Sequence, residues 1–120
     1  MFFIAYRKGT FDFPTETHSE LNYVTTKRAI GDLERVKENP EWSHIFQRTS
    51  PELVKRIKEM KIGESLYKTY RIGAIKMDPD RPSMTVRCSP GFLHYKSPRF
   101  MTPREVARLQ TFPDNFLFLG

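Results

Sequence analysis

The chain of 120 residues carries 20 lysines and arginines against 14 aspartates and glutamates, and the resulting formal net charge of +6 suits an anionic partner such as nucleic acid. This length predicts one domain over residues 1–120 and is small for an enzyme that holds its own cofactor fold. The single cysteine, Cys88, excludes an intramolecular disulfide and a cysteine-based zinc cluster, which favours a reducing, cytoplasmic setting.

The chain opens on an apolar run that is followed by a loop. Met1–Tyr6 predicts a buried strand that enters a turn at Gly9, and it is far too short for a membrane span or a secretory signal. We therefore expect an intracellular protein without a membrane segment. The loop over 10–21 contains His18, which is interpreted as structural rather than as a catalytic base because no second histidine lies near it in the sequence.

Two helices are predicted in the first half of the chain. Val24–Leu33 begins with threonines that can cap a short packing helix, which Gly31 weakens. Ser50 and Pro51 begin a second helix, whose core face consists of Leu53, Val54, Ile57 and Met60. The opposite face is basic and consists of Lys55, Arg56, Lys58 and Lys61. We interpret this face mainly as solvated surface, and direct contact with phosphates is the less favoured alternative.

Short strands and turns are predicted after the second helix. Ser83–Cys88 alternates in polarity, and Phe92–Tyr95 follows a Ser-Pro-Gly turn as its pairing partner. Asp78–Pro82 is a turn by composition. The predicted fold class is therefore α+β, with a small, irregular antiparallel β-sheet and a few short helices.

The segment 97–114 contains a well-marked helix start. Thr102 can cap a helix that begins at Pro103, where the missing N–H costs nothing, and Glu105 completes a capping box. The predicted apolar stripe of this helix is formed by Val106, Leu109 and Phe112. Another face carries Arg104 and Arg108, and Pro113 is predicted to end the helix.

The string Arg-Phe-Met-Thr-Pro-Arg-Glu-Val-Ala-Arg-Leu-Gln-Thr-Phe-Pro-Asp-Asn-Phe, at 99–116, resembles the ninth shared motif of the cytosine-C5 DNA methyltransferases. The resemblance implies that motif nine spans 97–114 and that the chain is the target-recognition domain, the small lobe of a two-lobed enzyme. It also implies that the chain begins just after the eighth motif. Structural roles within motif nine are implied for Arg99, Thr102, Arg104, Glu105, Arg108 and Phe112.

A second resemblance concerns the residues that would touch DNA. Pro-Ser-x-Thr-Val, at 82–86, resembles the segment that closes the recognition region in this family, where it lies close to the DNA. Basic residues in or beside the neighbouring loops are added as phosphate contacts. The predicted DNA-binding residues are Arg71, Lys76, Arg81, Ser83, Thr85, Val86, Arg87 and Lys96.

The catalytic motifs of the family have no counterpart in this sequence. Its cofactor loop, Pro-Cys nucleophile loop, Glu-Asn-Val acid and Gln-x-Arg-x-Arg motif are missing, and Cys88 stands between Arg87 and Ser89 rather than after proline. We expect no catalytic, cofactor-binding or metal-binding residues here, and an isolated chain without methyltransferase activity. The complete restriction-modification enzyme would use S-adenosylmethionine, double-stranded DNA and a catalytic lobe or subunit.

Two other classes of protein are alternatives to this interpretation. A small basic module that docks on a protein or on RNA, without reading DNA sequence, remains the alternative function. A self-sufficient small enzyme such as a nuclease would need a carboxylate or histidine cluster, which the sequence does not show.

Overall fold

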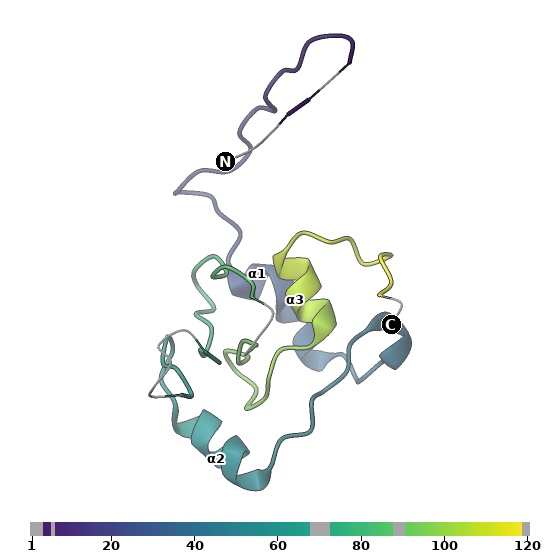
Figure 1. The fold of residues 1–120 in the computed structure, drawn as a ribbon. Coiled ribbons are helices and arrows are strands. Elements are labelled where there is room, and N and C mark those ends of the chain that lie inside the picture. Colours follow the sequence, from purple (N-terminus) through teal and green to yellow (C-terminus); the bar gives the residue numbers. More distant parts are fainter. Residues whose placement is uncertain (1–3, 6, 68–72, 88–90, 119–120) are drawn as a thin grey trace.

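The structure is a computed structural model that describes residues 4–5, 7–67, 73–87 and 91–118. Its elements in chain order are α1 (Thr26–Ile30), η1 (Gly31–Arg35), η2 (Pro40–Trp42), α2 (Pro51–Glu59) and α3 (Pro103–Leu109). Figure 1 shows α1 beside α3, α2 at the far end of the body, and residues 4–24 extending away as an arm. The described part of the arm is exposed almost throughout.

The first predicted helix is confirmed as α1 and continues as η1. Thr25 accepts a hydrogen bond from the Arg28 N–H at 3.1 Å, which caps the helix. Gly31 begins η1, so the chain tightens into a 3-10 helix at the residue that was expected to weaken the α-helix. Ile30 and Leu33 are fully buried and fix this pair of elements to the core.

The second predicted helix is confirmed as α2. The Ser50 side chain accepts from the Leu53 N–H at 3.3 Å, and Pro51 occupies the first helical position. Ile57 and Met60 are buried, as the sequence predicts. The Lys76 ammonium donates to the carbonyls of Ile57 and Met60, at 3.2 and 2.9 Å, and so caps the helix C-terminus.

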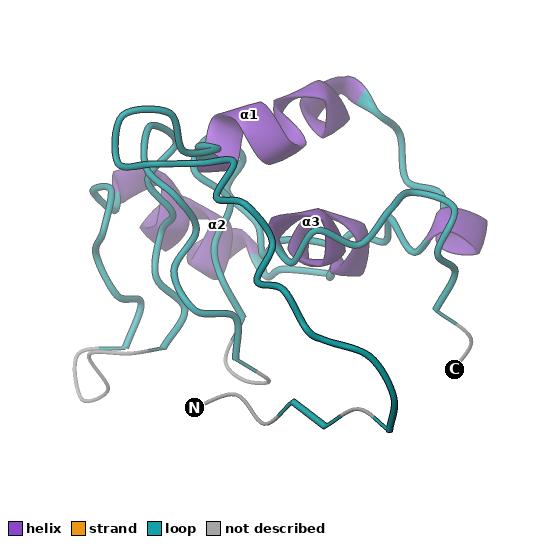
Figure 2. Ribbon diagram, turned by 90° about the horizontal axis from the view of Figure 1, so that it is seen from above, coloured by secondary structure: helices purple, strands orange, loops and turns teal. Residues whose placement is uncertain are grey.

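The predicted antiparallel sheet is wrong. Within the described residues there is no strand, and backbone pairing is limited to isolated bridges, among them Lys76 with Leu93 and Leu93 with Phe100. Figure 2 accordingly draws the described segments between the helices as loop. In the Ser83–Arg87 segment only Ser83 and Val86 are half-buried and the other residues are exposed, so the segment lacks the alternating buried face of a paired strand.

The strand expected at Met1–Tyr6 is not seen in the described part of that run. Ile4 is 46% exposed and belongs to no strand, while residues 1–3 and 6 lie outside the described residues. An extended apolar segment without a neighbouring strand has no partner for its backbone groups or its side chains.

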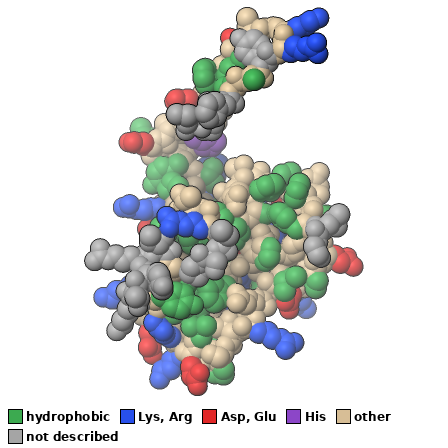
Figure 3. All heavy atoms as spheres, in the orientation of Figure 1, with side chains coloured by type: hydrophobic (Ala, Val, Ile, Leu, Met, Phe, Trp, Pro, Cys, Tyr) green, Lys and Arg blue, Asp and Glu red, His purple; other side chains and the backbone are tan. Residues whose placement is uncertain are grey.

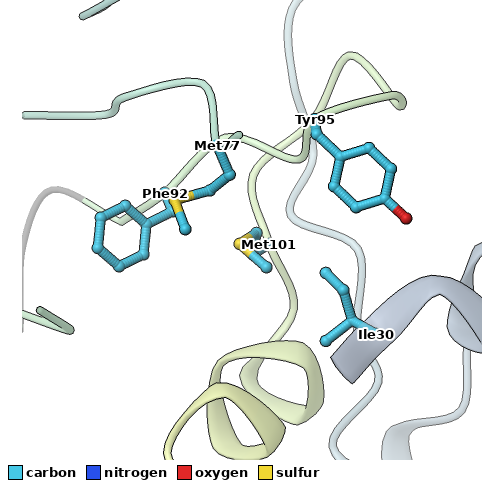
Figure 4. Packing of buried hydrophobic residues seen from close by; sticks show 5 residues of the cluster. All are labelled: Ile30, Met77, Phe92, Tyr95 and Met101. Carbon is cyan, nitrogen blue, oxygen red and sulfur yellow. The ribbon is translucent and has the colours of Figure 1, made fainter. Parts of the chain in front are cut away.

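The core has two adjoining parts. The first consists of Ile30, Met77, Phe92, Tyr95 and Met101, and Figure 4 shows Met101 lying between Phe92 and Ile30. The second consists of Ile57, Met60, Leu66, Ala74 and Leu93. Backbone hydrogen bonds from Met77 N–H to Leu93 O (3.1 Å) and from Leu93 N–H to Ile75 O (2.9 Å) join the two parts.

Candidate nucleic-acid interface

An exposed loop over 78–87, called the reading loop below, has fixed ends. The Thr26 N–H and hydroxyl donate to the Arg81 carbonyl at 2.8 and 3.0 Å, and the Lys27 N–H donates to the Pro79 carbonyl at 3.0 Å. The two N–H groups belong to the first turn of α1, where backbone N–H groups have no acceptor within the helix. At the other end Val86 packs against the first core cluster. The loop between these anchors faces solvent.

Several predicted DNA-binding residues come together on the reading loop. Arg81 has a side chain that is 79% exposed, with an Asp78 oxygen 3.7 Å away, an ion pair that contributes little in water. Thr85 and Arg87 are exposed, while Ser83 is half-buried and donates its hydroxyl to the Met84 carbonyl at 2.9 Å. The loop therefore presents two arginines and a threonine on a short stretch of chain.

The two predicted lysines have partners within the protein. Lys76 caps α2, as described above. The Lys96 ammonium lies 2.5 Å from a Glu34 oxygen, and the Tyr95 hydroxyl donates to the same carboxylate. Hydrogen bonds from Lys96 and then Tyr95 hold the pKa of Glu34 below its usual range. Arg71 and Cys88 lie outside the described residues.

The capping box predicted at the start of α3 is confirmed. The Glu105 N–H donates to the Thr102 hydroxyl at 3.2 Å, and the Thr102 N–H donates to the Glu105 carboxylate at 2.8 Å. Arg99 adds two parallel bonds to the same carboxylate, at 2.7 and 2.8 Å. Burial raises the pKa of Glu105, but the bonds from Arg99 and Thr102 outweigh it and the net shift is downward.

Two buried histidines flank this carboxylate. His94 Nδ1 accepts from the Lys96 and Ser97 N–H groups, so its proton is on Nε2, which lies 3.7 Å from a Glu105 oxygen. Burial lowers the pKa of His94 to about 4. His44 Nδ1 is hydrogen-bonded to the Thr102 hydroxyl at 2.9 Å, and burial likewise lowers its pKa. His44 is completely buried.

The apolar stripe predicted for α3 is only partly correct. Val106 and Leu109 pack against the first core cluster, but Phe112 lies beyond the end of the helix and is 37% exposed. The helix ends before Pro113 because Thr111 adopts a left-handed φ of 64°, and the Thr111 and Phe112 N–H groups donate to the Arg108 and Ala107 carbonyls. These two bonds form a Schellman motif with threonine at the position that usually holds glycine.

The burial of Arg104 and the carbonyl groups that it contacts could not be predicted from the sequence. Its side chain is fully buried and donates to the carbonyls of Trp42 (3.0 Å), Pro113 (3.3 Å) and Phe116 (2.7 Å). Arg108 is bonded to both Asp32 and Asp114, at 2.6 to 2.8 Å. The two arginines of this face thus tie α3 to its own C-terminal segment and to distant parts of the chain.

The described residues contain neither a metal site nor a membrane-spanning helix. No group of three or more histidine, cysteine, aspartate or glutamate side chains there could hold a metal ion. No helix in the same ranges is long and apolar enough to cross a membrane.

Comparison with known proteins identifies the chain. Residues 5–120 match the C-5 cytosine-specific DNA methylase family, so the chain belongs to that family, and the resemblance seen in motif nine is confirmed. It is 34% identical to the type II methyltransferase M.BbvI of Brevibacillus brevis, over 92% of this chain and 33% of that protein. It is 33% identical to M.NgoFVII of Neisseria gonorrhoeae, over 92% of this chain and 34% of that protein.

A third relative is shorter. M.AquIB of Picosynechococcus is 37% identical over 59% of this chain, and the match covers 55% of M.AquIB. The chain therefore spans about a third of the length of the first two relatives and a larger share of the third. No solved structure matches the chain.

Proposed function

We propose that this chain is the target-recognition part of a cytosine-C5 DNA methyltransferase. It would hold double-stranded DNA so that one cytosine turns out of the helix into a catalytic part located elsewhere. The observation that carries this proposal is the reading loop, an exposed basic segment with both ends fixed. Family membership and the net charge of +6 support it. The cytoplasmic setting expected from the sequence is part of the same proposal.

The reading loop would combine two kinds of contact. Arg81 and Arg87 would bind phosphates or guanine edges, and Thr85 would contact base edges in the major groove. Because the loop is anchored at Arg81 O and at Val86, little conformational freedom would be lost when it binds. Turning a cytosine out of the duplex costs a few kcal/mol, so the contacts between the protein and the DNA must be maintained while the base is displaced.

The groove beside α3 does not suit S-adenosylmethionine, the methyl donor of such an enzyme. That groove, of about 540 Å³, is lined by Arg87, by Gln47 and Gln110, and otherwise by apolar residues, and none of its described lining residues is a carboxylate. A positively charged sulfonium would meet an arginine there and no balancing anion. We therefore assign the donor, and the chemistry of methyl transfer, to the catalytic part.

The proposal is tested by the binding of a fluorescent DNA duplex to the whole chain at several salt concentrations. Double replacement of Arg81 and Arg87 by alanine should weaken binding and reduce the salt slope by up to about two, since each phosphate contact contributes about 0.9. The matched control replaces Arg35 and Lys37, two exposed cations away from the loop. Equal effects of the two double variants would favour a basic module that does not read DNA through this loop.

A further inference from the structure

We infer that the C-terminal segment carries the surface on which the catalytic part of the methyltransferase docks. This inference rests on the proposed function, because it names the face that joins the recognition part to its partner. The surface, called the aromatic patch below, consists of Phe112, Phe116, Leu117 and Phe118.

The aromatic patch is exposed although its members are large and apolar. The exposed fractions are 37% for Phe112, 44% for Phe116, 53% for Leu117 and 45% for Phe118. The three rings pack on one another, with centroids 5.0 to 5.8 Å apart. In Figure 3 hydrophobic side chains gather at the right of the body, where the C-terminal segment runs. A contiguous apolar surface of this kind marks a binding site.

The segment that carries the patch is held in place by hydrogen bonds to side chains of Arg104, Trp42 and Arg108. Arg104 donates to the carbonyls of Pro113 and Phe116, and the Trp42 indole N–H donates to the Asp114 carbonyl at 2.9 Å. Arg108 binds the Asp114 carboxylate with two bonds of 2.7 and 2.8 Å. The rings are therefore presented on a fixed backbone, which reduces the entropy lost when a partner covers them.

The charge of the patch favours a protein partner over DNA. Between Gln110 and Phe118 the only ionisable residue is Asp114, and Arg108 already binds its carboxylate. This segment offers no cation for a phosphate group. Aromatic side chains with few charges are typical of the centre of protein interfaces.

The position of the patch identifies the catalytic part as the partner. The groove of about 540 Å³ is lined both by Arg87 of the reading loop and by Phe112 and Phe118 of the patch. A protein seated on the patch would therefore lie next to the loop proposed to hold DNA. The relatives M.BbvI and M.NgoFVII are about three times as long as the matched region, so most of each lies outside it.

The test measures assembly of this chain with the catalytic part of the same methyltransferase. The probe is the purified polypeptide that carries the cofactor loop and the Pro-Cys loop, titrated calorimetrically with the whole chain. Replacing Phe116 and Phe118 by asparagine should weaken assembly by about tenfold or more. The control, Ile62→Asn, alters a side chain that is 45% exposed on another part of the surface and should change affinity by less than about twofold.

Each other outcome has a defined meaning. Unchanged assembly in the patch variant overturns the inference. Loss of duplex DNA binding by the isolated patch variant also overturns it, because the patch would then belong to the DNA surface. If the isolated chain self-associates and the patch variant does not, the patch is an interface between copies and the inference fails. A wild-type chain that binds no DNA, yet assembles through the patch, would refute the proposed function and leave the inference standing.

Discussion

Arg99 and Glu105 face each other through two parallel hydrogen bonds of 2.7 and 2.8 Å, and the Glu105 carboxylate is fully buried. The two hydrogen bonds link the loop that precedes α3 to the first turn of that helix. Replacing Arg99 by methionine would leave the buried carboxylate without its cation, so the free energy of unfolding should fall by about 3 kcal/mol. Urea unfolding measures this change. Arg81→Met, at a mainly exposed side chain, is the control and should stay within about 0.5 kcal/mol of wild type.

Thr102→Ala removes a cap that also contacts a buried histidine. The helix would lose the acceptor for the Glu105 N–H, and His44 would lose its partner at 2.9 Å. We expect a loss of about 2 kcal/mol, the upper end for a helix cap. Thr25→Ala, which removes the cap of α1, should cost less, about 1 kcal/mol. Coincident thermal melts of Thr102→Ala and wild type would show that the capping box is not formed in solution.

Acid should destabilise the protein through His94. Its pKa is near 4 in the folded protein and near 6.5 when unfolded, so between these values the unfolded chain binds more protons. Stability should therefore rise with pH across this window, by at most roughly 1 kcal/mol per pH unit from this group. The charged groups around His94 are Glu105, Arg99, Glu34 and Lys96. Because the pKa of Glu105 is also lowered, protonation of that carboxylate acts in the same direction at lower pH.

The contribution of His94 is separated from that of Glu105 by His94→Gln, which removes the titrating imidazole. Urea unfolding between pH 4 and 7 should then show a shallower dependence on pH than wild type. His18→Gln is the matched control, since His18 is exposed on the arm. An equal slope in wild type and His94→Gln would contradict the assignment of a buried, neutral imidazole.

Thr111→Gly should stabilise the protein. Thr111 has a φ of 64°, which is unfavourable for a β-branched residue by about 1–2 kcal/mol, and glycine adopts it without strain. The greater freedom of glycine in the unfolded chain offsets part of this gain, so we expect a net increase of about 0.5–1 kcal/mol. Differential scanning calorimetry measures the expected rise in melting temperature. Thr85→Gly, at a residue without positive φ, should not raise the melting temperature.

The helices were predictable because their caps are local. Ser50 and Thr102 lie within three residues of the N–H groups they bind, so a short stretch of sequence contains both partners. The absence of a sheet was not predictable in this way. An alternating run such as Ser83–Cys88 forms a strand only if a distant segment pairs with it, and in the described residues Leu93 instead bridges Lys76 and Phe100.

In the candidate site, as in the fold, only the features that depend on neighbouring residues in the sequence were predictable. Thr85 and its neighbours were predicted as DNA contacts from a local string, and that string lies in a loop in which Thr85 is exposed. The sequence pointed to Lys76 as a DNA contact because it lies beside the loop, but its ammonium binds the end of a helix 16 to 19 residues earlier. The burial of Arg104 depends on the Trp42 carbonyl, 62 residues away. Long-range acceptors of this kind leave no mark in the sequence around the donor.

At its Arg81 end the reading loop contributes only main-chain atoms to the hydrogen bonds that anchor it. Thr26 and Lys27 bind the carbonyls of Arg81 and Pro79, which every amino acid possesses. Side chains in the loop can therefore be exchanged without loss of the hydrogen bonds that position it. A methyltransferase built in this way could acquire a new target sequence by substitution within the loop while α1 and the core stay unchanged.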